Sequence, residues 1–131
     1  MVKLQRLHRL AGWSAILLFA LSGITMRTIF PTAYAARESV RYLYRANHVY
    51  ILFGGLLNLL LGRYLEEAQS ARGRLQLAGS LLLLAAPWLL VAAFVAEAPR
   101  GLPGRPMTTL GVVFAAAGVA LHLVPGRREA S

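Results

Sequence analysis

The sequence predicts an all-α fold: a four-helix transmembrane bundle with up-down-up-down topology, in a single integral membrane domain covering residues 1–131. The chain is 57% hydrophobic, with a mean hydropathy of +0.57. Only 15% of its residues are charged, whereas about 25% are charged in an average soluble domain. The apolar residues fall into four blocks, each about long enough to cross a bilayer as a helix.

The first expected span covers about residues 8–30, and Pro31 is expected to end it because proline cannot continue the hydrogen bonding of a helix. The connection that follows, residues 32–46, is amphipathic. Arg37, Arg41 and Arg45 repeat every four residues within it. Because arginine side chains suit the headgroup layer of a membrane, we expect a short interfacial helix between the first two spans.

The other spans are expected at about residues 47–64, 75–96 and 107–124. Asn58 falls in the middle of the second span, where an amide must bond to a neighbouring helix. Pro87 should kink the third span and free a carbonyl that neighbouring groups must satisfy. The short connections between the last three spans favour an up-down-up-down bundle, in which the first and fourth spans are neighbours.

The net charge of +9 comes from fourteen Lys and Arg residues against five acidic residues. Nearly all the basic residues flank apolar blocks, where anionic lipid headgroups and membrane topology explain them, so nucleic-acid binding is not expected. A small excess of basic residues on the side of the termini favours cytoplasmic termini in a bacterial inner membrane. The lack of cysteine excludes disulfides and thiolate metal sites.

Two histidines suggest a cofactor site between the first and fourth spans. The first span opens with His8-x-x-x-Gly12, and the fourth closes with Gly118-x-x-x-His122. In antiparallel helices the two imidazoles lie at similar depth, each with a glycine one turn deeper. Imidazole is an axial ligand of haem iron, and glycine leaves room for a flat macrocycle. This pattern predicts a haem b whose iron is bound by His8 and His122.

Arg9 and Arg127 lie near the same membrane edge and are expected to pair with the haem propionates. The protein would then be a small b-type electron-transfer protein that serves a quinone or another redox partner. The alternative is a non-catalytic structural or assembly subunit of a larger membrane complex or oligomer, because small residues spaced by four also pack ordinary membrane helices. An enzyme is not expected, since no nucleophile–base pair, phosphate loop or carboxylate pair is present.

A second set of candidate ligands lies toward the other membrane edge. His48 begins the second span, Met26 lies near the end of the first and Met107 begins the fourth. A histidine with two thioethers suits Cu(I) or His/Met ligation of a haem, so copper is a candidate metal there. The simpler explanation is an interfacial histidine and two packing methionines. The arginine stripe that leads into His48 could instead hold an anionic lipid headgroup or a quinone headgroup.

The first 25 residues carry a resemblance to known families. Leu7-His8-Arg9-Leu10-Ala11-Gly12, followed by an apolar run and Ser22-Gly23, resembles the first helix of PepSY-type transmembrane proteins and of some b-type membrane cytochromes. The equivalent histidine in those families is often a haem ligand. The resemblance therefore implies a haem-ligand role for His8.

Overall fold

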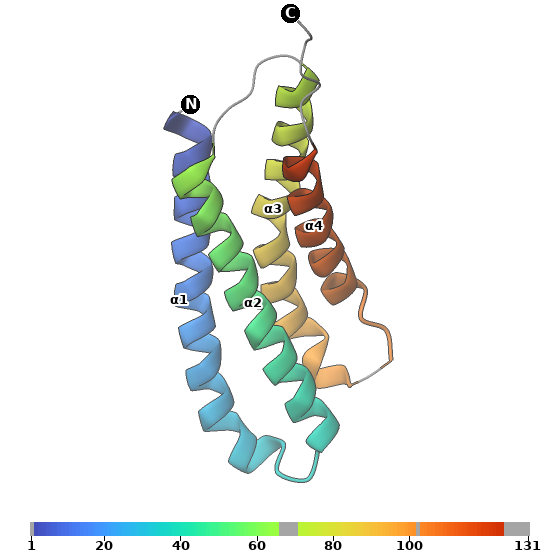
Figure 1. Ribbon diagram of the computed structural model, residues 1–131. Coiled ribbons are helices and arrows are strands. Elements are labelled where there is room, and N and C mark those ends of the chain that lie inside the picture. The colour runs from blue at the N-terminus through green and yellow to red at the C-terminus, as the bar shows by residue number, and fades with distance from the viewer. Residues whose placement is uncertain (1, 66–70, 102, 125–131) are drawn as a thin grey trace, which may run out of the picture.

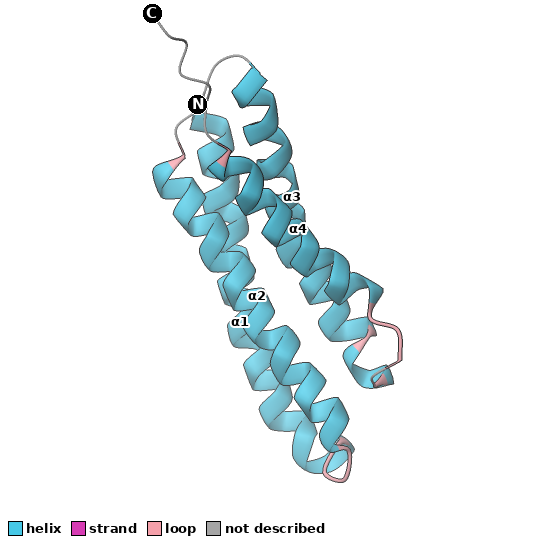
Figure 2. Cartoon of the chain, turned by 45° about the vertical axis from the view of Figure 1, so that its right-hand side comes forward, coloured by secondary structure: helices cyan, strands magenta, loops and turns pink. Residues whose placement is uncertain are grey.

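The computed structural model describes residues 2–65, 71–101 and 103–124, and these residues form helices joined by short connections (Figure 2). The elements in chain order are α1 (Val2–Ala33), α2 (Glu38–Tyr64), α3 (Ala71–Ala96), the short 3-10 helix η1 (Ala98–Arg100) and α4 (Pro106–Leu123). The expected all-α fold class is confirmed for the described part of the chain.

The four α-helices form two antiparallel hairpins (Figure 1). α1 packs along α2, and α3 packs along α4, while contacts between α2 and α3 join the hairpins. The expectation that the first and fourth spans are neighbours is wrong, because the described residues of α1 and α4 make no contact. The N-terminal end of α1 and the C-terminal end of α4 nevertheless lie at the same end of the molecule (Figure 1).

Facing glycines explain this pairing of helices. A Cβ added to Gly12 would lie 2.9 Å from the carbonyl oxygen of Gly55 on α2. A Cβ added to Gly118 would lie 2.8 Å from the carbonyl oxygen of Gly79 on α3. Backbones this close leave no room for any side chain. Gly12 and Gly118, expected to border a slot between the first and fourth spans, pack the two hairpins instead.

Two local expectations between α1 and α2 also need correction. Pro31 lies inside α1, which continues to Ala33. A proline in the last turn removes only one helical bond, so the helix can run past it. The expected separate interfacial helix is not formed, because α2 already begins at Glu38 and includes Arg41 and Arg45. No glycine or proline interrupts residues 38–53, so a helix that starts there continues inward.

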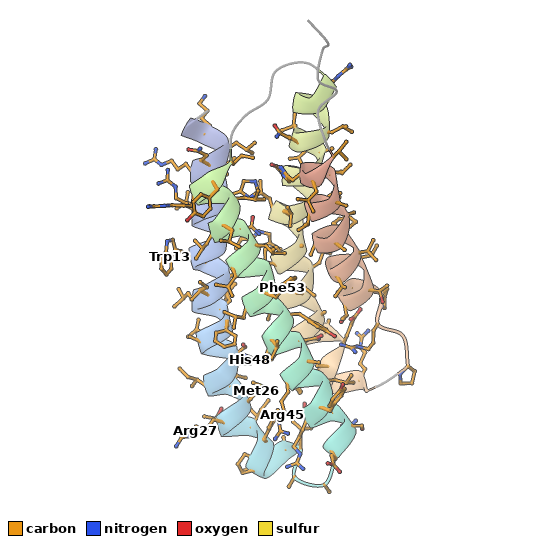
Figure 3. The ribbon with its side chains drawn as sticks, in the orientation of Figure 1. Trp13, Met26, Arg27, Arg45, His48 and Phe53 are labelled. Atoms are coloured by element: carbon orange, nitrogen blue, oxygen red, sulfur yellow. The ribbon has the colours of Figure 1, made fainter. Side chains whose placement is uncertain are left out.

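Three of the described helices are long and apolar enough to cross a membrane: the candidate spans are Lys3–Ala33, Gly73–Arg100 and Pro106–Leu123. This agrees with an integral membrane protein. The helix α2 has 27 residues but carries arginine, asparagine and histidine side chains along its length, and it is not among the three. Trp13 is 64% exposed and points away from the bundle on the outer side of α1 (Figure 3).

Two apolar clusters hold the bundle together. The larger joins α1, α2 and α3 and includes Ile51 and Leu90. The smaller lies between α3 and α4 and includes Leu83 and Ala115. Polar side chains are buried as well, among them His8, Asn58 and Glu97, and they form the sites described next.

Candidate functional site

His8 of α1 is buried completely, with none of its surface exposed. Its Nδ1 lies 2.7 Å from Oδ1 of Asn58 on α2. Its Nε2 is buried as well and has no hydrogen-bond partner among the described residues. Leaving a buried polar atom unpaired costs about 1 to 3 kcal/mol. This nitrogen is therefore the first candidate for binding a ligand.

Asn58 ties this histidine to α3. Its Nδ2 donates to the carbonyl oxygen of Leu83 at 2.7 Å and to that of Gly54 at 2.9 Å. The Leu83 carbonyl would normally accept from residue 87, but Pro87 has no N–H. The expectations that Asn58 bonds to a neighbouring helix and that the carbonyl freed by Pro87 finds a donor are both confirmed.

His122 of α4 is half-buried, and its Nε2 lies 3.2 Å from Oγ of Ser80 on α3. It borders an apolar cleft of about 190 Å³ that includes Leu57 and Val119. A second apolar cleft of about 320 Å³ shares these two residues and continues between α2 and α4. Apolar space therefore begins beside His122 and extends toward the middle of the bundle.

His8, Asn58, Ser80 and His122 together are termed the histidine cluster. Its members come from all four helices. His8 lies near the start of α1 and His122 near the end of α4, at the same end of the bundle, although the described parts of these two helices do not touch. The two histidines lie at one end of the bundle, as their positions in the sequence predict, but the sequence did not identify Asn58 and Ser80 as their partners. The depth of Asn58, level with a histidine on the preceding antiparallel helix, was the signal that could have identified it.

The arginines expected near the cofactor are placed in part. Arg9 is exposed on α1, and its backbone and side chain pass over Gly62 near the end of α2. It therefore lies one residue from His8 with its guanidinium outside the packed interior. Arg127 lies outside the described residues.

His48 occupies a separate position between α1 and α2. Ser22 Oγ donates to the carbonyl oxygen of Phe19 at 2.8 Å and lies 2.7 Å from Nδ1 of His48. The ring of His48 stacks on Phe19 with centroids 3.9 Å apart, and it covers Gly23. These contacts hold the imidazole by packing and one hydrogen bond.

The expected copper ligands are not brought together as a set. Met26 lies in the core between α1 and α2, in the same region as His48 (Figure 3). Met107 is 38% exposed at the start of α4, a helix that α1 does not contact. Within the described residues, no three His, Cys, Asp or Glu side chains gather in a way that could hold a metal ion.

A polar network at the start of α4 was not anticipated from the sequence. Glu97 is buried, and its carboxylate accepts hydrogen bonds from the backbone N–H groups of Met107 and Thr108 and from the Thr108 hydroxyl. Arg105 donates to Oδ1 of Asn47 on α2 at 2.8 Å. Glu97 thus caps α4, and Arg105 ties that end of α4 to the other hairpin.

No protein-family model matches the chain, and neither a curated protein nor a solved structure matches it.

Proposed function

We propose that the protein is a small integral membrane b-type cytochrome whose haem iron is bound by His8 and His122. The observation that supports this best is the Nε2 of His8, which is buried and has no hydrogen-bond partner in the part of the chain that the structure describes. A metal-binding histidine characteristically uses one ring nitrogen for the metal and hydrogen-bonds the other to an oxygen atom. His8 Nδ1 makes such a hydrogen bond with the amide oxygen of Asn58.

His122 would supply the second imidazole. In the described part of the chain its helix, α4, makes no contact with α1, so a haem held by both histidines would lie between helices that do not pack on each other. Binding of the iron through Nε2 of His122 would replace the contact of that atom with Ser80. The apolar clefts beside His122 offer a surface for the edge of the ring.

The space beside His122 is small for a haem. The cleft beside His122 is about 190 Å³, below the range of about 300 to 1,000 Å³ that small-molecule sites occupy. Haem would therefore need more room beside His122 than this cleft provides. The haem would supply one-electron redox chemistry, while His8 and His122 bind its iron, and Arg9 and Arg127 would neutralise its propionates.

In this proposal all four helices span the membrane, with cytoplasmic termini in a bacterial inner membrane. The redox partner would be a quinone or another electron carrier, and anionic lipid headgroups would contact the arginines at the helix ends. The same proposal makes the protein an electron carrier rather than an enzyme.

An absorption spectrum of the protein purified in mild detergent, before and after addition of haem, tests this proposal. We expect a Soret band with the sharp reduced α band of a six-coordinate b-type haem. His8→Ala should abolish the six-coordinate spectrum, because it removes an axial ligand.

The matched control is His48→Ala, which removes a histidine held by Ser22 and Phe19 at a different place in the bundle. This variant should retain the wild-type spectrum. Absence of a Soret band from both the purified and the haem-treated protein would refute the proposal, and so would a wild-type spectrum from His8→Ala.

The second candidate is a non-catalytic structural or assembly subunit of a larger membrane complex. The contact of Ser80 with His122 favours it, because it gives that histidine an ordinary structural partner. We would then expect the protein to migrate with other subunits when native membranes are solubilised in digitonin and separated by size. Migration as an isolated monomer would contradict this role.

A further inference from the structure

We infer that Asn58 is a positioning residue, which holds His8 as the Nδ1–H tautomer and so leaves Nε2 of His8 as the available nitrogen. This inference deepens the proposed function, because Nε2 is the atom proposed to bind iron. It concerns the chain's own hydrogen bonds, however, and it can be tested without haem.

The first step is the orientation of the Asn58 amide. Asn58 is fully buried, and one end of its amide faces two carbonyl oxygens, those of Gly54 and Leu83. A carbonyl can only accept, so this end must be the NH₂ group. Reversing the amide would place an oxygen against two oxygens and break both hydrogen bonds. The orientation therefore follows from the network.

The second step fixes the proton of His8. With its NH₂ group committed, Asn58 can offer only Oδ1 to the imidazole. An amide oxygen accepts and cannot donate, so Nδ1 of His8 must carry the proton. In a neutral imidazole the other nitrogen, Nε2, then has a free lone pair. This matches its position in the structure, buried and without a donor or acceptor.

The Asn58 amide is anchored on α3. Pro87 withholds an N–H from the Leu83 carbonyl, which leaves that oxygen to Asn58. Gly54 packs against Pro87, where an added Cβ would lie 3.5 Å from the proline ring, so α2 approaches α3 closely at this point. Pro87 on α3 thus leaves the Leu83 carbonyl free to orient Asn58. Asn58 in turn determines which ring nitrogen of His8 on α1 carries no proton.

Nitrogen-15 NMR of the full chain, labelled at histidine and prepared in detergent without added haem, tests this inference at a pH where the imidazoles are neutral. The chain has three histidines, which single substitutions to glutamine assign. We expect His8 to show a protonated Nδ1 and an unprotonated Nε2. Asn58→Leu should shift the tautomer ratio of His8 about tenfold toward Nε2–H, the equivalent of one hydrogen bond.

Asn47→Leu is the matched control, because Asn47 is also a fully buried asparagine of α2, but it accepts hydrogen bonds from Arg105, which precedes α4, and from Thr108 on α4. This variant should leave the His8 tautomer unchanged. The signals of His48 provide an internal reference, since its Nδ1 bonds to Ser22 and not to Asn58.

An Nε2–H tautomer of His8 in the wild-type protein would overturn the inference, whether or not Asn58→Leu folds. An unchanged tautomer in a folded Asn58→Leu variant would overturn it as well. The outcome is separable from that of the haem test: an Nδ1–H tautomer without a Soret band would support Asn58 as a positioning residue and reject the cytochrome.

Discussion

Replacing Gly118 with alanine should destabilise the α3–α4 hairpin. The new Cβ would lie 2.5 Å from Cγ of Leu83 and 2.8 Å from the backbone oxygen of Gly79. Leu83 can turn aside, but the backbone oxygen cannot. Since carbon atoms pack best at about 3.5 to 4.0 Å, the helices must separate by about 1 Å. Such overpacking typically costs about 1 to 3 kcal/mol.

Gly54→Ala is the control for this substitution. A Cβ at Gly54 would have its nearest neighbours, atoms of Pro87, at 3.5 Å, which is an ordinary contact. Alanine is favoured over glycine within a helix by about 1 kcal/mol, so this variant should be as stable as the parent or more stable.

The assay is reversible unfolding of the detergent-solubilised protein by SDS, followed by circular dichroism. Gly118→Ala should unfold at lower SDS than the parent, and Gly54→Ala should not. If Gly118→Ala is as stable as the parent, then α3 and α4 are not as close at Gly79 as the structure indicates, and the glycine account of helix pairing fails.

Two further predictions concern the ends and the outer surface of the bundle. Glu97→Gln should lower the stability of the protein by about 1 kcal/mol in the same assay, because it removes the charge that caps α4. Glu38→Gln should cost less, because this exposed residue in the first turn of α2 makes no capping hydrogen bond among the described residues. Trp13 and Trp88 are 64% and 48% exposed, so brominated acyl chains should quench their fluorescence in reconstituted vesicles.

Contrary results would be informative in each case. If Glu97→Gln and Glu38→Gln proved equally stable, the contacts of Glu97 would not cap α4 in the folded protein. Quenching of tryptophan by acrylamide but not by brominated lipid would place those side chains in water, and it would contradict a lipid-facing outer surface.

Asn58 and Pro87 show how much of the fold the sequence could predict. An amide and a helix-breaking residue inside apolar segments each carry an unmet hydrogen-bonding demand, and burial in an apolar surrounding makes that demand costly. The sequence therefore indicated that both must be satisfied by neighbouring helices. It did not show that one hydrogen bond meets both demands, the bond that Asn58 donates to the Leu83 carbonyl freed by Pro87.

The pairing of helices could not be predicted in the same way. Gly12 and Gly118 were assigned to one interface because they stand one turn from the two histidines. Small residues permit close approach to any helix, and their spacing does not name the partner. Gly12 faces Gly55, and Gly118 faces Gly79, within the two hairpins. These glycine pairs can be recognised only when the positions of the helices along the bundle axis are known.

The partners of Glu97 bear on how the protein enters the membrane. Its hydrogen bonds reach only 10 and 11 residues along the chain, whereas His8 and Asn58 are 50 residues apart. The contacts of Glu97 can therefore form as soon as the start of α4 has been synthesised. The histidine cluster takes a residue from each of the four helices, and His122 lies near the end of α4, so the cluster can be completed only after all four helices have been made.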